Sequence, residues 1–303
     1  MKILILGGAG FLGRNISRYF LLKGYEIRVF DAVRPLYEIK GIEYITGNFF
    51  EEGNIIPYLS DVDVVIHAIS SINPGNSNDL YMQGYNNDFV YSVKLADYSI
   101  KYHFRLLFLS SGGTVYGKQE HMPIAEDATA VPINHYGNLK LCIENTYRTF
   151  NTQSKADIKI VRIANPYGPG QDYKKGVGLI DAVLKCAIQK QSVNIFGDGS
   201  VIRDYIYVDD VCAMLEKVIL YHGAEAVFNI GTQTGTTQLE IINYVRQIIP
   251  DLSVTYLPAR PVDVPCIILN NTKIMSLYGK KCIDIKDGIL EYYKYIQSGE
   301  VDR

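Results

Sequence analysis

The sequence is poor in cysteine, and the spacing of the few cysteines argues against a disulfide scaffold and against a zinc site. Five cysteines are dispersed over 303 residues, without the close pairs of a disulfide scaffold or a zinc site: Cys142, Cys186, Cys212, Cys266 and Cys282. An odd, scattered set in a chain of this length indicates reduced thiols and a cytoplasmic setting. We therefore expect neither disulfides nor a bound metal.

An excess of positive charge and a long apolar run are also missing. The chain has 30 lysines and arginines and 32 aspartates and glutamates, which gives a formal net charge of −2. This balance argues against nucleic acid or a membrane surface as the main partner. No stretch approaches the roughly 20 apolar residues of a membrane helix. Glycines interrupt the apolar start from Gly7 onward, so we expect a soluble protein that starts at its own first strand.

Short apolar runs alternate with amphipathic segments in the first half of the chain. The runs suit strands buried on both faces of a parallel sheet: residues 3–6, 27–31, 42–46, 62–67, 106–110 and 158–163. Helices are expected at residues 11–23, with Gly24 as a left-handed cap, 80–101 and 136–150. The alternation predicts an α/β fold with a Rossmann-type doubly wound parallel sheet.

The alternation of apolar runs and amphipathic segments becomes irregular after Ala164. Turn-rich loops follow at residues 165–170 and 197–200, and the later elements are expected at residues 179–190, 208–221, 227–230 and 239–249. We expect residues 1–164 to form a dinucleotide-binding domain, with return segments near 204–232. Residues 165–303 are expected to form mainly a smaller α/β substrate domain.

A glycine-rich segment, Gly7-Gly8-Ala9-Gly10-Phe11-Leu12-Gly13, ends the first predicted strand and opens a predicted helix. Gly7 permits a tight turn, Gly10 lets the backbone approach a pyrophosphate, and Gly13 lets helix and strand pack closely. The start of the helix, at Phe11 and Leu12, offers free N–H groups and a partial positive charge to the phosphates. The segment therefore predicts a dinucleotide site.

The next apolar run ends in Asp31, 18 residues beyond Gly13. A carboxylate there can accept hydrogen bonds from the adenine-side ribose and would repel a 2′-phosphate, which favours NAD. Arg34 lies close enough in sequence to leave NADP open.

Tyr136 and Lys140 are four residues apart, on one face of a predicted helix. A tyrosine has an ordinary pKa of about 10, so it needs help to act as a base. A nearby ammonium and an oxidised nicotinamide ring would both favour the phenolate. Taken alone, the same spacing also fits a solvated helix face.

Taken with the glycine segment, these residues resemble the extended short-chain dehydrogenases, especially the nucleotide-sugar 4-epimerases and their reductase and dehydratase relatives. The resemblance follows motif order over nearly the whole chain and includes residues 67–68, 110–117, 165–168, 197–210 and 260–263. It implies that Tyr136 is the general base and acid. It also implies that Lys140 holds the nicotinamide ribose and lowers the pKa of Tyr136.

The resemblance implies further cofactor and substrate contacts. Ala68 would contact the cofactor, and Asn48 and Phe49 would contact adenine, although the family usually has aspartate at position 48. The expected ligands of a nucleotide sugar are Arg203 and Arg260 for the pyrophosphate, Asp263 for the ribose, Phe196 for the base, and Asn165 for the phosphate or sugar. Arginine suits this task because its planar guanidinium makes bidentate phosphate contacts.

One departure from the family pattern concerns the catalytic hydroxyl. The family has serine or threonine where this chain has Gly112, so Ser111 and Thr114 are the neighbouring substitutes, and we favour Thr114. Losing such a polarising group without replacement can cost about 2.7–4 kcal/mol of transition-state stabilisation.

The primary hypothesis is NAD-dependent 4-epimerisation of a nucleotide diphosphohexose through a 4-keto intermediate. A 4-ketoreductase that uses NAD(P)H on a 4-keto-6-deoxy sugar nucleotide shares every motif and stays open. A 4,6-dehydratase is disfavoured because Gly113 and Thr114 replace the Asp-Glu pair of that class. A non-catalytic dinucleotide sensor is disfavoured because Tyr136 and Lys140 are retained. The family also implies a homodimer formed by the helices near residues 80–101 and 136–150.

Overall fold

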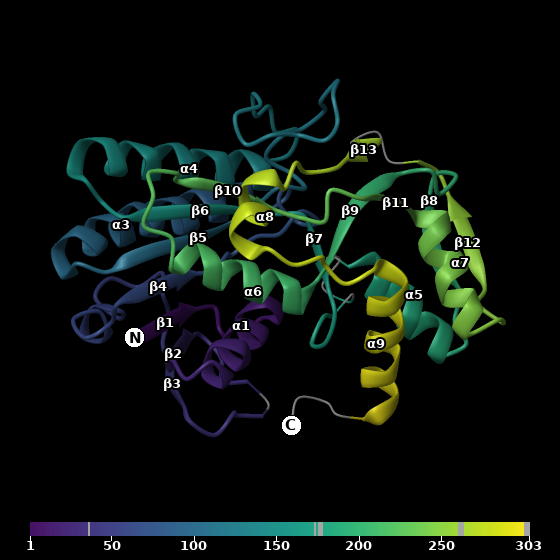
Figure 1. Cartoon of the computed structure of the whole chain (residues 1–303), viewed down its shortest axis with the longest axis horizontal. Helices are drawn as coiled ribbons and strands as arrows, with labels where there is room; N and C mark the ends of the chain where they lie inside the picture. Colours follow the sequence, from purple (N-terminus) through teal and green to yellow (C-terminus); the bar gives the residue numbers. More distant parts are fainter. Residues whose placement is uncertain (36, 173, 175–177, 260–263, 300–303) are drawn as a thin grey trace.

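The computed structural model describes the whole chain except residues 36, 173, 175–177, 260–263 and 300–303. Its centre is a sheet of seven strands in the order β10-β6-β5-β4-β1-β2-β3, in which every pair of neighbours is parallel (Figure 1). The strands are β1 (Lys2–Leu6), β2 (Glu26–Asp31), β3 (Ile42–Thr46), β4 (Val64–His67), β5 (Arg105–Ser111), β6 (Ile158–Ile163) and β10 (Val227–Ile230). The order reverses between β1 and β4, which confirms the doubly wound prediction.

Helices cover both faces of this sheet: α1 (Phe11–Leu22) and α6 (Val208–Ile219) on one face, α3 (Val90–Tyr102) and α4 (His135–Ser154) on the other (Figure 1). Successive residues of β1 point to opposite faces, as the pleat requires. Ile5 belongs to the core that contains Phe20 of α1, whereas Leu4 belongs to the core that contains Leu139 of α4. Gly24 follows α1 with φ 84°, as predicted for a left-handed cap.

The helix predicted over residues 80–101 is confirmed as one continuous helical segment over residues 81–102, but it is not α-helical throughout. It is divided into α2 (Tyr81–Gln83), a π-helical turn (Gly84–Phe89) and α3. Within the wider turn the buried carboxylate of Asp88 accepts hydrogen bonds from the Ser70 hydroxyl at 2.5 Å and the Ser71 N–H at 2.9 Å. These bonds tie the turn to the loop after β4, a long-range contact that helical periodicity cannot reveal.

A smaller α/β part lies beside the carboxyl end of the main sheet (Figure 1). Its strand β9 (Ile202–Tyr207) pairs with β7 (Asn165–Tyr167), β11 (Gly235–Thr237) and β13 (Cys266–Ile267), and β8 (Val193–Phe196) pairs with β12 (Val254–Leu257). Its helices are α5 (Leu179–Ile188), α7 (Gln238–Ile248) and α9 (Ile285–Ser298), while α8 (Thr272–Tyr278) packs against α6. Val183, Ile241 and Tyr292 belong to its separate core.

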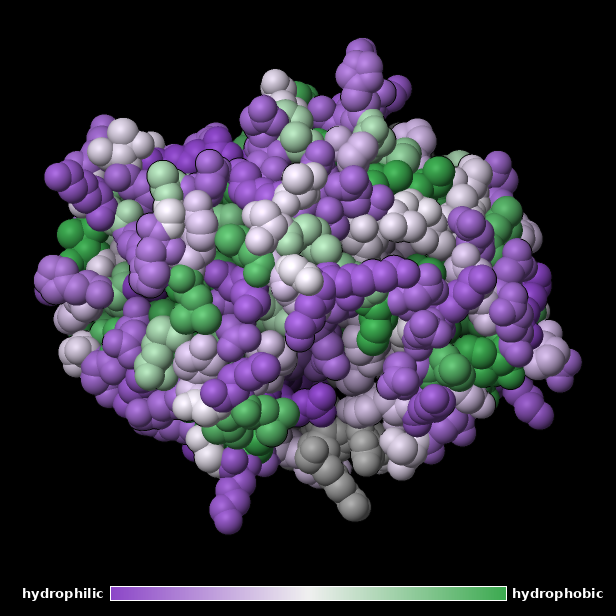
Figure 2. Space-filling view, viewed as in Figure 1, coloured by the Kyte–Doolittle hydropathy of each residue, from purple (hydrophilic) through white to green (hydrophobic). Residues whose placement is uncertain are grey.

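The surface and the cysteines agree with the composition. The face in Figure 2 is largely hydrophilic, with hydrophobic residues gathered in small patches. Over the described ranges, no helix combines the length and apolar character needed to cross a membrane. All five cysteines are free thiols. The described part of the chain also contains no cluster of side chains suited to hold a metal ion.

A buried ion pair joins α4 to the sheet. The Arg162 guanidinium of β6 donates to both carboxylate oxygens of Glu144 in α4, at 2.6–3.2 Å, and both residues are almost completely buried. The Ser110 hydroxyl of β5 donates to the same carboxylate at 2.5 Å. Arg162 also lies over the ring of Tyr116, 4.7 Å from its centre. The pair therefore fixes one helix against two strands.

Replacing Glu144 with glutamine should destabilise the protein strongly. Glu144→Gln leaves the buried Arg162 charge uncompensated, which costs about 3–5 kcal/mol of unfolding free energy. Urea unfolding would measure the loss, with Glu120→Gln at an exposed position as the matched control. Equal stability of the two variants would contradict this role for the ion pair.

Candidate functional site

The glycine segment forms a tight turn on which α1 begins. Gly7 has φ 84°, a conformation that favours glycine. A Cβ on Gly13 would lie only 2.2 Å from the carbonyl oxygen of Gly7, so the start of α1 packs directly on the turn. Gly10 is the N-cap of α1, and the first-turn N–H groups of Phe11 and Leu12 have no acceptor within the helix. This shape can receive a diphosphate.

The ends of β2 and β4 flank this turn. The Asp31 carboxylate at the end of β2 accepts a hydrogen bond from the Ala9 N–H at 2.9 Å. On the other side, a Cβ on Gly7 would lie 3.1 Å from the carbonyl carbon of Ala68, directly after β4. The structure thus brings Asp31, the glycine turn and Ala68 together at the switch point of the sheet, where ligands of this fold class bind.

The two residues expected to contact adenine have different surroundings. Asn48 is exposed, and its side chain accepts from the Phe50 N–H at 3.0 Å and donates to Glu51 at 3.1 Å. Phe49 is only 2% exposed and its ring packs 5.7 Å from the ring of His67. The side chain of Phe49 is therefore part of the core, which leaves only its main chain for a ligand contact.

The predicted catalytic pair lies in the first two turns of α4. The N-cap Asn134 accepts from the Gly137 N–H at 2.8 Å and fixes the start of the helix. The Lys140 ammonium lies 5.5 Å from the centre of the Tyr136 ring and donates to the Leu109 carbonyl at 3.3 Å. Both side chains therefore lie beside the carboxyl end of β5.

Burial dominates the ionisation of this pair. It raises the pKa of Tyr136, and the charge of Asp88 adds to the rise. Burial lowers the pKa of Lys140 to about 8, although the carboxylates of Asp88 and Glu144 oppose the shift. The lowering of the Tyr136 pKa that the resemblance implies is therefore not found in the protein alone. A positively charged cofactor ring beside the phenol is needed to favour the phenolate.

A loop after β5 packs against the start of α4. The Thr114 N–H donates to the Ser111 carbonyl at 3.2 Å in this loop. A Cβ on Gly137 would lie 2.5 Å from the Thr114 carbonyl oxygen, so the loop touches the helix next to Tyr136. The Thr114 hydroxyl is buried and has no hydrogen-bond partner among the described residues. It is thus available to a ligand group that reaches it.

Asn165 is the predicted substrate residue that lies nearest to this loop. Its side-chain oxygen would lie 3.7 Å from a Cβ on Gly113, and its amide donates to the Asp204 carbonyl at 3.0 Å. The structure therefore brings Asn165 and the loop together at the same edge of the sheet.

Two further predicted substrate residues, Arg203 and Phe196, belong to strands of the smaller α/β part. Arg203 of β9 donates to the Val264 carbonyl at 2.7 Å, and Phe196 at the end of β8 is level with Leu257 of β12. Both neighbours belong to segments that flank residues 260–263. Arg260 and Asp263 lie outside the described residues.

Two buried acids beside the site, Asp204 and Glu144, are not among the predicted site residues. Asp204 is completely buried and accepts hydrogen bonds from the Thr232 hydroxyl and from three backbone N–H groups, and burial raises its pKa to about 6. Glu144 lies four residues after Lys140, on the same face of α4. This spacing could have indicated Glu144, whereas no local signal indicates the surroundings of Asp204.

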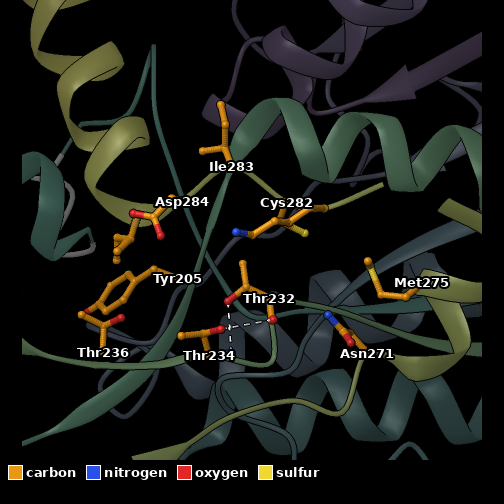
Figure 3. A pocket seen from close by; sticks show the side chains of 11 residues that line it. Tyr205, Thr232, Thr234, Thr236, Asn271, Met275, Cys282, Ile283 and Asp284 are labelled. Carbon is orange, nitrogen blue, oxygen red and sulfur yellow. Dashed lines mark hydrogen bonds between the residues drawn. The ribbon is translucent and has the colours of Figure 1, made fainter. Parts of the chain in front are cut away.

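Figure 3 shows a small pocket in another part of the chain. It has a volume of about 160 Å³ and lies between β9, α8 and the segment before α9, with Thr232, Asn271 and Cys282 in its lining. None of the predicted site residues lines it. The predicted cofactor and catalytic residues therefore lie outside this pocket.

Comparison with known proteins decides the family. A model described as the NAD dependent epimerase/dehydratase family matches residues 3–231. The chain belongs to this family. It is 31% identical over 274 residues to UDP-glucose 4-epimerase of Bacillus subtilis, covering 80% of each chain. It is 28% identical over 305 residues to UDP-glucose 4-epimerase of Lactobacillus helveticus, covering 93% of this chain and 92% of the relative.

A solved structure is similar over almost the whole length. UDP-glucose 4-epimerase of Thermotoga maritima, determined with UDP-glucose, has a TM-score of 0.93 and 28% identity, and the likeness covers 99% of both chains. The resemblance inferred from the motifs is thereby confirmed.

NAD is the cofactor of this family, and the site fits it. The glycine turn offers a cradle that side chains would fill, and the Asp31 carboxylate stands beside it. Arg34, which left NADP open, is exposed and forms an ion pair with Glu38 at 2.8 Å. The Asp31 carboxylate at the end of β2 can accept hydrogen bonds from ribose hydroxyls, so this end of the site suits an unphosphorylated ribose.

The lowered pKa of Lys140 predicts a rise in stability at alkaline pH. Its pKa is about 8 in the folded protein and 10.5 when unperturbed, so the folded state loses the proton first. Below pH 8 both states are protonated; between pH 8 and 10.5 the unfolded state binds more protons, and stability rises by about 3 kcal/mol. Lys140→Met should remove this rise.

Urea unfolding at several pH values would measure it, with Lys118→Met at an exposed position as the control. Parallel pH profiles of the native protein and Lys140→Met would show that Lys140 ionises normally.

Proposed function

We propose that this protein is an NAD-dependent UDP-hexose 4-epimerase that interconverts UDP-glucose and UDP-galactose. The observation that carries the proposal is the position of Tyr136 and Lys140 in α4 near the carboxyl end of β5, at the same edge of the parallel sheet where the glycine turn follows β1. Full-length likeness to UDP-glucose 4-epimerases supports it. The relatives reported above are epimerases, so the comparisons do not favour the rival ketoreductase.

The reaction needs one proton acceptor and one hydride acceptor. NAD⁺, when bound, would supply the hydride acceptor for C4 of the sugar and, once reduced, the hydride donor for the opposite face of that carbon. The Tyr136 oxygen takes the proton of the 4-hydroxyl and returns it after the 4-keto sugar has turned about its diphosphate link. Lys140 would hold the nicotinamide ribose, with its ammonium close to the ring of Tyr136. Thr114 would donate its free hydroxyl to the sugar oxygen.

The nucleotide must stay bound while the sugar turns. We assign this task to Arg203, Arg260, Asp263, Phe196 and Asn165, with residues 165–303 mainly as the substrate domain. Remote binding of this kind positions the reacting centre without restricting it. The cofactor side falls to Gly7, Gly10, Phe11, Leu12, Gly13, Asp31, Asn48, the Phe49 main chain and Ala68.

Tyr136→Phe should abolish most of the activity without loss of cofactor. Removing the proton acceptor should lower kcat by about 10²–10⁴-fold. The native protein and the variant would be assayed for UDP-glucose and UDP-galactose interconversion, and NAD(H) released on denaturation would be quantified. Tyr98→Phe, on the neighbouring helix α3, is the matched control.

Bound NAD with interconversion that depends on Tyr136 supports the epimerase. An empty, exchangeable cofactor site without interconversion would favour the ketoreductase instead.

We also infer a homodimer that forms through α3 and α4 and works in the cytoplasm. Val90 at the start of α3 is 41% exposed, and Ile133 just before α4 is 45% exposed. Five free thiols are consistent with a reducing compartment.

The dimer can be tested with one substitution that introduces a charged side chain into the proposed interface. Val90→Asp should yield a monomer in size-exclusion chromatography with light scattering, because it places a carboxylate in an apolar contact. Leu22→Asp, at a 78% exposed position at the end of α1, should leave the dimer intact. A native monomer at micromolar concentration would refute the proposed dimer.

A further inference from the structure

Gly112 occupies the position of the missing family hydroxyl, yet its backbone does not require glycine. Its φ lies outside the left-handed region, so an L-residue could adopt the same backbone. The obstacle is space. A Cβ at this position would lie 2.4 Å from Cδ1 of Leu269, 3.2 Å from its Cδ2 and 3.2 Å from the Arg162 carbonyl oxygen. The Leu269 side chain thus fills the space that a serine side chain would need.

Leu269 is held firmly in this position. It is completely buried in the core. The residues on either side of it bond to Ile124: the Ile124 N–H donates to the Ile268 carbonyl, and the Asn270 N–H donates to the Ile124 carbonyl, both at 2.8 Å. The Leu269 N–H itself donates to the buried Asp204 carboxylate at 3.3 Å. A serine at position 112 would therefore force Leu269 into an already filled core.

At the next position of the loop, Gly113, a side chain would meet no close contact. A Cβ on Gly113 would make only ordinary contacts with Asn165, at 3.7 Å or more. One residue further, the Thr114 hydroxyl is buried without a partner, and the Thr114 backbone touches the helix turn beside Tyr136. The backbone of Thr114 is thus close to the helix turn that contains Tyr136, and its hydroxyl has no partner among the described residues, whereas position 112 has no hydroxyl.

We propose that Leu269 is a positioning residue that excludes a hydroxyl side chain from position 112 and thereby assigns the catalytic hydroxyl to Thr114. The assignment to Thr114 rests on the proposed epimerase function. Leu269 does not touch the substrate; it acts by filling the space beneath the loop. Leucine at 269 and glycine at 112 are complementary in volume, so a smaller residue at 269 should permit a larger one at 112.

The packing half of the proposal is tested without a substrate. Thermal unfolding would be followed for Gly112→Ala, Leu269→Ala and the double variant. Gly112→Ala should lower Tm by crowding Leu269, and Leu269→Ala should lower it by leaving a cavity. The double variant should have a higher Tm than Leu269→Ala. Independent, additive effects, or an unchanged Tm for Gly112→Ala, would overturn the exclusion.

The catalytic half is tested by moving the hydroxyl. Thr114→Val should lower kcat about 100-fold with little change in KM, whereas Thr114→Ser should stay within a few-fold of the native protein. Adding Gly112→Ser together with Leu269→Ala to Thr114→Val should restore kcat at least tenfold. Leu269→Ala alone in that background should not restore it. Variants are compared at equal bound NAD content.

Native kcat in Thr114→Val, or rescue by Gly112→Ser with Leu269 intact, would overturn the proposal. The two halves also separate its failure from that of the proposed function. A native protein without interconversion would refute the epimerase and the role of Thr114, while the Tm cycle would still decide whether Leu269 excludes a side chain at 112.

Discussion

The buried ion pair of Glu144 and Arg162 fixes the position of α4 on the sheet. The positions of the predicted catalytic residues Tyr136 and Lys140 depend on it. Tyr136, Lys140 and Glu144 are spaced four residues apart, so they share one face of the helix. Glu144 is bound to β6 through Arg162 and to β5 through the Ser110 hydroxyl. Since a helix is stiff over two turns, fixing Glu144 also fixes Lys140 and Tyr136 beside the carboxyl ends of these strands. A hydrophobic contact of the same area would be less specific in register, because it has no direction.

The same burial leaves the catalytic groups in unfavourable charge states. The protein alone raises the pKa of Tyr136 and lowers that of Lys140 to about 8, opposite to what a phenolate beside an ammonium requires. Asp88, held by Ser70 and Ser71, favours the Lys140 ammonium but opposes the phenolate. The ionisation of the pair is therefore coupled to the charge that the cofactor brings.

Local patterns were enough to predict the sheet and the glycine turn, and they are the basis of the roles proposed for Asp31, Tyr136 and Lys140. Each of these depends on a short-range rule: a continuous apolar run, a glycine at a turn, or a spacing of four along a helix. The features that escaped prediction depend on contacts between distant segments. Phe49 turns into the core because His67 lies beside it, and the π-helical turn follows from the bonds of Asp88 to the loop after β4. No window of sequence around either residue contains its partner.

Gly112 shows why a departure from a family motif must be interpreted in three dimensions. Along the chain it indicates a lost hydroxyl, and hence a weaker catalyst or a different reaction. In the fold it is one half of a packing pair, because Leu269, 157 residues later, takes up the volume. Leu269 is bound through its N–H to Asp204 of β9, the strand that also carries Arg203. Leu269, which packs under the loop after β5, is thus bound to the part of the chain that we propose to hold the nucleotide sugar. A change of residue at 269 would therefore act on the loop and on the substrate side together, which explains why a single serine could not simply be restored at position 112.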